Sequence, residues 1–162
     1  MNKLILLLKN KKGMTLIEIV LSITILSILL LIVVPESNII LKFKERKELL
    51  EFKTDLNCAR NKAICDGMRY SIKLFPRNNF YYIYKYERFP EVVAKKEFKN
   101  GIRIENTNFN GSLNSKPTEI MFTSTGAPSK GGRIIIRNKK NEKILITVEP
   151  ATGKVNLYID GE

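Results

Sequence analysis

The 162-residue sequence contains no histidine and only two cysteines. Without histidine there is no imidazole to act as a general base or to bind a metal through nitrogen. The two thiols, Cys58 and Cys65, are too few sulfur ligands for a tetrahedral zinc site. No nucleophile–base pair, carboxylate dyad or phosphate-binding loop stands out. We therefore expect no catalytic residue, no metal and no cofactor, and a protein that is not an enzyme.

Acidic residues are scarce relative to basic ones. The chain has 28 Lys and Arg against 16 Asp and Glu, which gives a formal net charge of +12 at pH 7. Residues 1–13 carry four lysines and no acid, and residues 67–162 carry a net charge of +8, whereas residues 36–66 are nearly balanced. The positive charge therefore lies at the N-terminus and in the C-terminal region, where it would attract anionic polymers.

A long apolar run is the most informative feature that is present. Residues 14–35 carry a single charge, Glu18. As a helix, residues 14–34 are about 31 Å long, which is enough to cross the hydrocarbon core of a bilayer. The lysines that precede it favour a cytoplasmic N-terminus. We expect a single-pass protein in the cell membrane, with a transmembrane helix over residues 14–35 and the C-terminal region outside the cell.

Glu18 needs an explanation, because an acidic residue costs about 2.5–3.5 kcal/mol at the centre of a membrane helix and less near its end. A secretory signal peptide does not fit, since the apolar core is too long and no small-residue cleavage site follows it. A simple signal anchor fits the length but gives the glutamate no role. An inert charge near the membrane interface is the remaining structural alternative.

The residues before and around Glu18 resemble the processing motif of type IV prepilins and pseudopilins. The stretch "KKGMTLIE" joins a basic leader that ends in glycine to a glutamate four residues beyond the new terminus. The resemblance implies that a membrane prepilin peptidase cuts between Gly13 and Met14 and methylates the amine of Met14, where the family usually has phenylalanine. Residues 1–13 would be the leader. Its basic residues nearest the cleavage site are Lys9, Lys11 and Lys12.

Cleavage would place an α-amino cation at Met14 in the same apolar layer as Glu18. Opposite charges attract strongly where water is excluded. We expect Glu18 to be an assembly contact that is unpaired in the monomer and binds the amine of a neighbouring subunit, which sets the axial register of a filament. The expected partners are the prepilin peptidase, the membrane, and the major and other minor pilin-like subunits.

Residues 36–66 continue as an amphipathic helix. Apolar residues at three- and four-residue steps predict one buried stripe: Leu49, Phe52, Leu56, Ala59 and Ala63. Gly67 is a plausible helix stop, and Pro35 is expected to kink the helix without necessarily ending it. We expect one helix of about 50 residues, half in the membrane. Cys58 and Cys65 share a face but cannot bridge in a regular helix, which favours small buried hydrophobes over a disulfide or redox pair.

Residues 67–162 change from helical to strand periodicity. The predicted strands are short, β-branched and aromatic, and cover 68–75, 79–86, 118–125, 132–138, 143–149 and 154–159. The stretches "PRNN" and "NKKN" predict hairpin turns. Because no helical pattern alternates with these strands, we expect an antiparallel sheet and an α+β fold, with the long N-terminal helix packed on a C-terminal β head as in pilins.

A second resemblance covers residues 121–158. The stretches "MFTSTGAPSKGGRIIIRN" and "ILITVEPATGKVNLY" are similar to the C-terminal module of minor pseudopilins of the type II secretion H and fimbrial T kind. Among these, the D subunit of the Gram-positive competence pseudopilus is most similar. The resemblance implies a minor structural subunit of a pseudopilus that takes up DNA in competence, with a type II secretion system or a type IV pilus as the alternatives.

Two features of the head suggest contact with nucleic acid. Basic residues gather around one predicted hairpin: Lys130, Arg133, Arg137, Lys139, Lys140 and Lys143. They would give salt-dependent DNA binding, and a solvated basic face or attraction to anionic wall polymers is favoured over it. The run Tyr81, Tyr82, Tyr84 and Tyr86 could stack on bases, but sheet packing is favoured.

Overall fold

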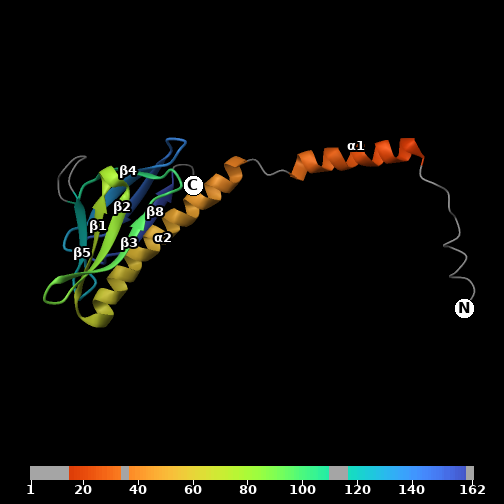
Figure 1. Ribbon diagram of the computed structural model, residues 1–162. Helices are drawn as coiled ribbons and strands as arrows, with labels where there is room; N and C mark the ends of the chain where they lie inside the picture. The colour runs from red at the N-terminus through yellow and green to blue at the C-terminus, as the bar shows by residue number, and fades with distance from the viewer. Residues whose placement is uncertain (1–14, 34–36, 110–116, 160–162) are drawn as a thin grey trace, which may run out of the picture. The chain divides into compact units, whose positions relative to one another are not determined.

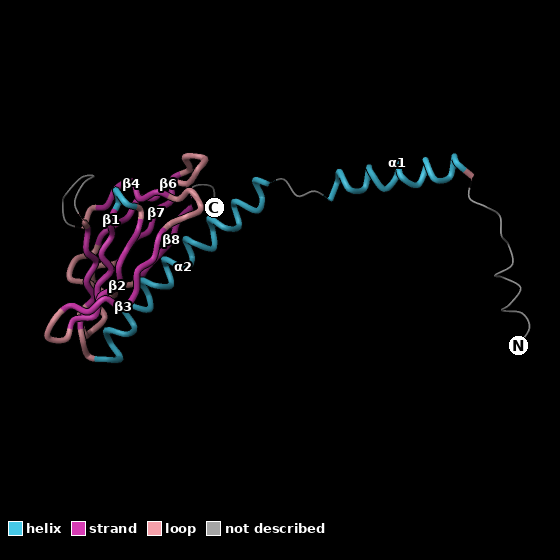
Figure 2. The backbone as a smooth tube through the Cα atoms, viewed as in Figure 1, coloured by secondary structure: helices cyan, strands magenta, loops and turns pink. Residues whose placement is uncertain are grey.

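The computed structural model describes residues 15–33, 37–109 and 117–159. The chain divides into one unit that ends at Ile40 and a second unit, Leu41–Glu162. Two α-helices are described, α1 (Leu16–Val33) and α2 (Ser37–Asp66), and Figure 2 shows them in cyan. The single continuous helix expected from the sequence is thus described as two helices. Pro35, the expected kink, lies outside the described residues.

Helix α1 is apolar around its whole circumference. Leu16, Ile19 and Val20 are all strongly exposed in the isolated chain. Its hydroxyl groups are satisfied within the helix, because Ser22 Oγ donates to the Glu18 carbonyl at 2.7 Å and Ser27 Oγ donates to the Ile23 carbonyl at 2.8 Å. A helix with apolar side chains on every side is stable only where something other than water surrounds it.

Helix α2 buries one stripe against the strands, as the sequence predicts. Each residue of the stripe is at most 2 % exposed: Leu49, Phe52, Leu56, Ala59 and Ala63. The helix ends at Asp66, and Gly67 follows with a φ of +65°, a left-handed conformation that glycine adopts without strain. The predicted helix stop is therefore confirmed.

Within the described residues, eight strands follow α2, and every pairing between them is antiparallel. Their bounds are β1 Arg69–Phe75, β2 Phe80–Tyr86, β3 Pro90–Glu97, β4 Arg103–Thr107, β5 Thr118–Phe122, β6 Gly132–Arg137, β7 Lys143–Val148 and β8 Val155–Ile159. They form two four-stranded sheets, sheet A in the order β3-β2-β1-β5 and sheet B in the order β4-β6-β7-β8. The α+β fold with antiparallel strands is confirmed, although the head contains two sheets rather than one.

Both predicted hairpin turns are present. Between β1 and β2 the chain makes a short 3₁₀ turn over Pro76–Asn78 and then places Asn79 at φ +56°. Between β6 and β7 the turn ends with Asn141 at φ +64°. Asparagine tolerates this left-handed region because its side chain can hydrogen-bond locally. These turns fix the registers in which Phe75 pairs with Phe80 and Arg137 pairs with Lys143.

One apolar core joins α2 to both sheets. Buried side chains from α2, such as Phe52, lie in the same cluster as Ile72 of sheet A and Ile146 of sheet B. Figure 1 shows α2 running along the strands of the head. Phe52 also packs against two aromatic rings, with centroids 4.9 Å from Tyr81 and 5.3 Å from Phe98. The helix and the sheets of the head therefore fold as one body.

Two glycines meet beneath the C-terminal part of α2. Gly126 and Gly153 have φ values of +80° and +67°, and a Cβ added to Gly153 would lie 2.4 Å from the Gly126 carbonyl oxygen. Arg60 of α2 donates from Nε to that same oxygen at 3.3 Å. Both glycines thus occupy turns that require positive φ. Gly153 has no room for a side chain because the Gly126 turn approaches it closely, whereas a Cβ at Gly126 would meet the Ile64 side chain of α2.

The two cysteines are not buried. Cys58 and Cys65 are both free and exposed on α2. The interpretation of these residues as small buried hydrophobes is therefore wrong. The reason is helical phase, since the buried stripe runs through Leu56, Ala59 and Ala63, and both cysteines fall on the opposite side of the helix.

Candidate functional site

Glu18 lies in the first turn of α1, where it forms a capping box with Thr15. The Thr15 backbone N–H donates to Glu18 Oε2 at 2.8 Å, and the Thr15 hydroxyl donates to the same oxygen at 3.1 Å. In return, the Glu18 backbone N–H donates to Thr15 Oγ1 at 3.4 Å. This reciprocal arrangement satisfies N–H groups that have no partner inside the helix, and it begins α1 at this point.

Glu18 is therefore not unpaired in the monomer, and that part of the sequence-based expectation is wrong. The carboxylate uses one oxygen, Oε2, for both contacts with Thr15. Its role as an assembly contact stays a prediction. The other residues of the processing motif lie outside the described residues: Lys9, Lys11, Lys12, Gly13 and Met14.

The sequence predicts a membrane span over residues 14–35. Within residues 15–33, 37–109 and 117–159, no helix combines the length and the apolar character needed to cross a membrane. The expected span of residues 14–35 also includes positions 14, 34 and 35, which are not among the described residues.

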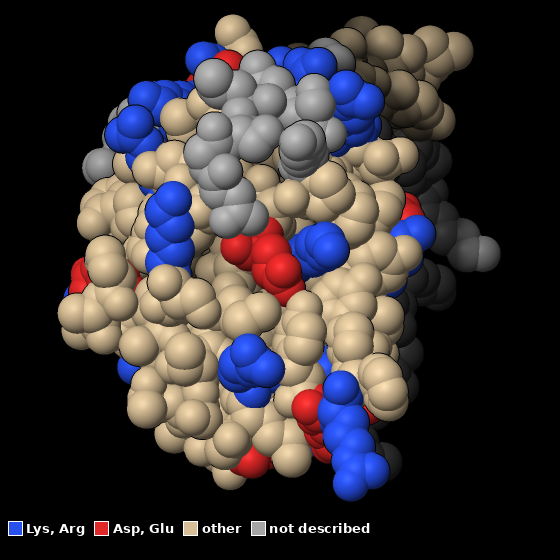
Figure 3. Space-filling model, turned by 90° about the vertical axis from the view of Figure 1, so that its left-hand side faces the viewer, with Lys and Arg blue, Asp and Glu red and all other residues tan. Residues whose placement is uncertain are grey.

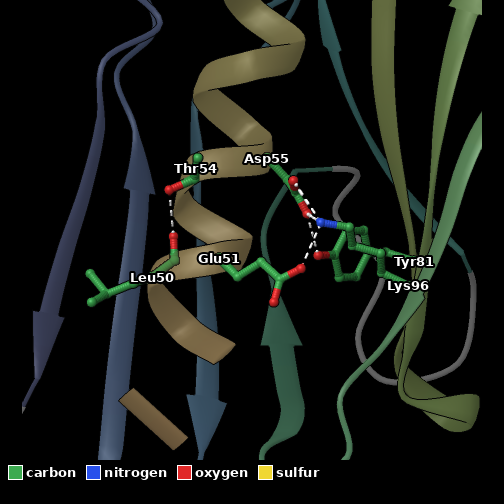
Figure 4. Close-up of polar contacts among 6 residues, drawn as sticks. All are labelled: Leu50, Glu51, Thr54, Asp55, Tyr81 and Lys96. Atoms are coloured by element: carbon green, nitrogen blue, oxygen red, sulfur yellow. Dashed lines mark hydrogen bonds and ion pairs between the residues drawn. The ribbon is translucent and has the colours of Figure 1, made fainter. Parts of the chain in front are cut away.

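A polar cluster joins the middle of α2 to sheet A (Figure 4). The Tyr81 hydroxyl on β2 donates to Asp55 Oδ2 at 2.6 Å. Lys96 Nζ on β3 lies 2.8 Å from Asp55 Oδ2 and 2.7 Å from Glu51 Oε1. One turn of helix thus presents two carboxylates to a phenol and an ammonium group from two neighbouring strands, which fixes the helix against the sheet.

The electrostatics of this cluster follow from its burial and its charges. The pKa of the Tyr81 hydroxyl is raised well above its ordinary value, first by burial and then by its hydrogen bond to Asp55. The pKa of Glu51 is lowered, chiefly by the hydrogen bond from Lys96. For Lys96 burial opposes the charge, but the hydrogen bonds to Asp55 and Glu51 outweigh it and raise the pKa. At neutral pH the cluster therefore holds a neutral phenol and a charged lysine between two carboxylates.

A second contact between helix and strand lies beside this cluster. The Glu48 carboxylate accepts the backbone N–H groups of Lys99 at 2.6 Å and Asn100 at 3.1 Å. A groove of about 380 Å³ separates it from Lys96, and Tyr81 and Phe98 line the groove floor. No local sequence pattern indicates these contacts, because Glu51 and Glu48 meet partners 45 and 51 positions away.

The predicted basic hairpin exists, and its turn is well anchored. Asn138 Nδ2 donates to Glu45 Oε2 of α2 at 3.3 Å and to Glu142 Oε2 at 2.6 Å. Asn138 Oδ1 accepts the backbone N–H groups of Lys140 and Glu142 at 3.0 and 2.9 Å. The side chains of Lys139 and Lys140 are therefore held on a fixed turn and exposed to solvent.

The basic residues do not form one patch. Lys130 and Arg133 lie at the start of β6, whereas the other four lie at or beside the β6–β7 turn: Arg137, Lys139, Lys140 and Lys143. The Cα atoms of Arg133 and Arg137 are about 14 Å apart along an extended strand. Arg137 is also engaged, since Nε lies 2.9 Å from Glu105 Oε2 and the guanidinium donates to the Asn141 carbonyl. The basic residues are thus divided between the two ends of β6.

The tyrosine run is divided between the two faces of sheet A. Tyr81 is buried in the core, as sheet packing predicts. Tyr82, Tyr84 and Tyr86 point to the opposite face, where their rings are half-buried. Side chains alternate along a strand, so a run of consecutive aromatic residues supplies both faces. Tyr81 therefore packs in the core, while the other three tyrosines pack on the outer face of the sheet with their rings partly exposed.

No metal or cofactor site is evident in the parts of the chain that the structure describes. There, no three side chains of the metal-binding types are grouped closely enough to hold an ion. Every buried polar side-chain atom in these ranges also has a hydrogen-bond partner. The polar groups of the head are thus used to join its elements.

Residues 8–34 match a protein family described as the prokaryotic N-terminal methylation motif. This match includes Gly13, Met14 and Glu18, the residues on which the resemblance to prepilins depends. A comparison with curated proteins found no match.

The fold of the head matches solved structures of a minor pseudopilin. One is the structure of EpsH from the type 2 secretion system of Vibrio cholerae, with a TM-score of 0.59 and 14 % sequence identity over 74 % of this chain and 99 % of that chain. A crystal structure of the same protein gives a TM-score of 0.61 and 13 % identity over 75 % of this chain and 97 % of that one. The fold is therefore pilin-like.

Proposed function

We propose that this protein is a minor pilin-like subunit of a membrane-anchored pseudopilus. The observation that carries the proposal is that the methylation motif at residues 8–34 and the EpsH-like head occur in one chain. Either alone would be weaker evidence, because a short motif recurs by chance and a fold hosts many functions. The glycine at the end of the leader has a function only if a prepilin peptidase cleaves after it and so releases the helix for assembly.

In this proposal a prepilin peptidase removes residues 1–13 at the cytoplasmic face and methylates Met14. The domains are then a leader (1–13), a membrane and filament-core helix (14–35), an amphipathic helix (36–66) and a β head (67–162) outside the cell. The support is the apolar character of α1 on all sides and the four lysines before it.

Glu18 has a second role in this account. In the monomer it caps α1 through Oε2 alone. Its second oxygen is available to a cation, and the Met14 amine of a neighbouring subunit is the cation that processing creates. In an apolar layer this ion pair fixes the axial position of one helix against the next.

The proposed filament could belong to one of three cellular systems. We infer DNA uptake in competence, supported by the resemblance of residues 121–158 to the competence D subunit and by the net charge of +8 on residues 67–162. Protein secretion of the type II kind and a type IV pilus are the alternatives. Co-purification of the native membrane protein under cross-linking tests all three, since its neighbours would be competence, secretion or pilus subunits. Recovery without any pilin-like neighbour would contradict the whole proposal.

A DNA-binding role for the β6–β7 turn is a second candidate. It is favoured by the exposed Lys139 and Lys140 on a turn held by Asn138. Phosphate contacts of this kind are sequence-independent and weaken steeply with salt. A gel shift with duplex DNA at low and moderate salt tests it, and the absence of binding at low salt would exclude it.

A further inference from the structure

A continuous row of aromatic rings covers the outer face of sheet A, the face opposite α2 and the core. The row consists of Phe75 on β1 and four residues of β2: Phe80, Tyr82, Tyr84 and Tyr86. Neighbouring ring centroids lie 4.7 to 6.5 Å apart. All five rings are half-buried, so each has a part exposed to solvent. We call this surface the aromatic row.

The row lies on the two central strands of a four-stranded antiparallel sheet. The strand order is β3-β2-β1-β5, so β2 and β1 are flanked on both sides. Residues i and i+2 on the same face of a strand are about 6.8 Å apart, so the rings of β2 are evenly spaced. Core formation does not explain these rings, because the core of sheet A is built from the inward residues Tyr70, Ile72 and Ile83.

Basic side chains lie over and beside the rings. Lys95 Nζ is 4.7 Å from the centroid of Phe80 and 6.0 Å from that of Tyr82. The guanidinium of Arg69 is 5.9 Å from the centroid of Tyr86. Lys73 is paired with Tyr82 across β1 and β2. Figure 3 shows the side of the head nearest β5 and β1 as a mostly uncharged surface on which both basic and acidic groups are scattered.

Acidic groups on this face are already engaged. Glu119 Oε1 accepts the hydroxyl of Ser71 at 2.7 Å and the hydroxyl of Tyr86 at 2.6 Å. Glu97 lies 3.3 Å from Lys95. The Glu119 contacts fix the orientation of the Tyr86 ring, which makes this end of the row rigid before any ligand binds.

We propose that the aromatic row binds single-stranded nucleic acid by stacking. Two properties of this surface select this partner over others. Its rings lie at regular spacing on the central strands of an open sheet, and cations lie among them in a head with a net charge of +8. Sheets of this kind use such rings to stack successive bases, while lysine and arginine neutralise the phosphates. Duplex DNA does not fit, because its bases are already stacked on one another.

The inference does not depend on the filament function proposed above. A chain that assembles through Glu18 could lack nucleic-acid binding, and a chain that fails to assemble could retain it. The row also differs from the β6–β7 turn, which belongs to sheet B and carries lysines without aromatic partners. Binding through the turn depends on charge, whereas binding through the row depends on rings.

The test uses the full chain in non-ionic detergent and fluorescence anisotropy with a labelled oligodeoxythymidylate of about 12 nucleotides, a length comparable with known single-strand sites. We expect binding to the single strand at least about tenfold tighter than to a duplex of equal length. Equal affinity for both, or no binding at low salt, would overturn the proposal. The proposal would also be overturned if the oligonucleotide did not bind and a neutral linear wall glycan bound through the same rings.

Variants separate stacking from charge. Tyr82→Leu and Tyr84→Leu keep apolar bulk but remove the ring, and each should weaken single-strand binding about fivefold to a hundredfold. Tyr82→Phe and Tyr84→Phe should bind like the unmodified chain, because stacking needs the ring and not the hydroxyl. Lys139→Gln with Lys140→Gln removes charge from the other sheet and should change affinity less than either leucine variant. Unchanged thermal unfolding shows that each variant is folded. A charge variant that loses more affinity than the ring variants would refute stacking.

Discussion

The hydroxyl of Tyr81 lies 2.6 Å from Asp55 Oδ2, and this hydrogen bond joins the second strand of the head to the middle of α2. Asp55 Oδ2 also forms an ion pair with Lys96 Nζ of the adjacent strand, β3, at 2.8 Å. In a filament subunit, any force on the helix must reach the head through contacts of this kind. In the proposed filament subunit, the polar cluster would therefore transmit part of that force between α2 and the head.

The first prediction concerns alkaline stability. The folded chain raises the pKa of Tyr81 by burial and by the bond to Asp55, whereas the unfolded chain releases this proton near pH 10. Above pH 10 the folded state keeps the Tyr81 proton while the unfolded state loses it. The free energy of unfolding should therefore fall as the pH rises above 10, by up to about 1.4 kcal/mol per pH unit. Tyr81→Phe should make this fall shallower in pH-dependent urea unfolding. An unchanged slope would show that Tyr81 ionises freely in the fold.

The second prediction concerns Lys96. Lys96→Met should lower the free energy of unfolding by about 1–2 kcal/mol, because Asp55 loses a charge-assisted partner at a largely buried position. Lys95→Met is the matched control, since Lys95 is the preceding residue and pairs with Glu97 at the surface. That control should cost less than about 0.5 kcal/mol. Equal losses in urea denaturation would mean that the cluster around Asp55 contributes little.

The third prediction compares glycines of similar conformation. Gly67, Gly126 and Gly153 all have positive φ, but a Cβ would meet nothing at Gly67, the Ile64 side chain at Gly126 and backbone at Gly153. Gly67→Ala should therefore cost about 1–2 kcal/mol from backbone strain alone. Gly126→Ala should cost more and Gly153→Ala most, since a backbone oxygen cannot move aside as a side chain can. Thermal unfolding ranks the three, and a Gly153 variant as stable as the Gly67 variant would refute the close approach.

The fourth prediction separates the two roles of Glu18. Glu18→Ala should leave membrane association intact and abolish co-assembly with the major subunit, because the neighbour's amine loses its partner. Thr15→Ala removes the capping hydroxyl and keeps the carboxylate, and it should assemble normally. Co-purification of each variant with the major subunit provides the measurement. If both variants fail alike, helix capping rather than pairing between subunits explains the requirement for Glu18.

Local patterns in the sequence predicted the local structure of the head well. The stripe from Leu49 to Ala63, the stop at Gly67 and the two hairpin turns are encoded by residues that are close in the sequence. The sequence patterns did not predict strands β3 and β4. Both lie at sheet edges, where polar and charged side chains replace the alternating apolar pattern of a half-buried strand. The division into two sheets went unpredicted for the same reason.

Contacts between distant residues could not be read from the sequence. Nothing near Glu48 or Asp55 indicates that their partners are Lys99, Lys96 and Tyr81. The aromatic row was similarly hidden, because the run of tyrosines does not show which rings face outward until the register of β1 and β2 is known. Sequence motifs predict the processing site, whereas the surfaces of the head required the fold.

The N-terminus of the mature protein tests the central claim most directly. Intact-mass and terminal-peptide spectrometry of the protein purified from its native membrane should show a chain that begins at a methylated Met14 and lacks residues 1–13. A native chain that keeps all thirteen of these residues would contradict the account, because Glu18 would then have no neighbouring amine to bind.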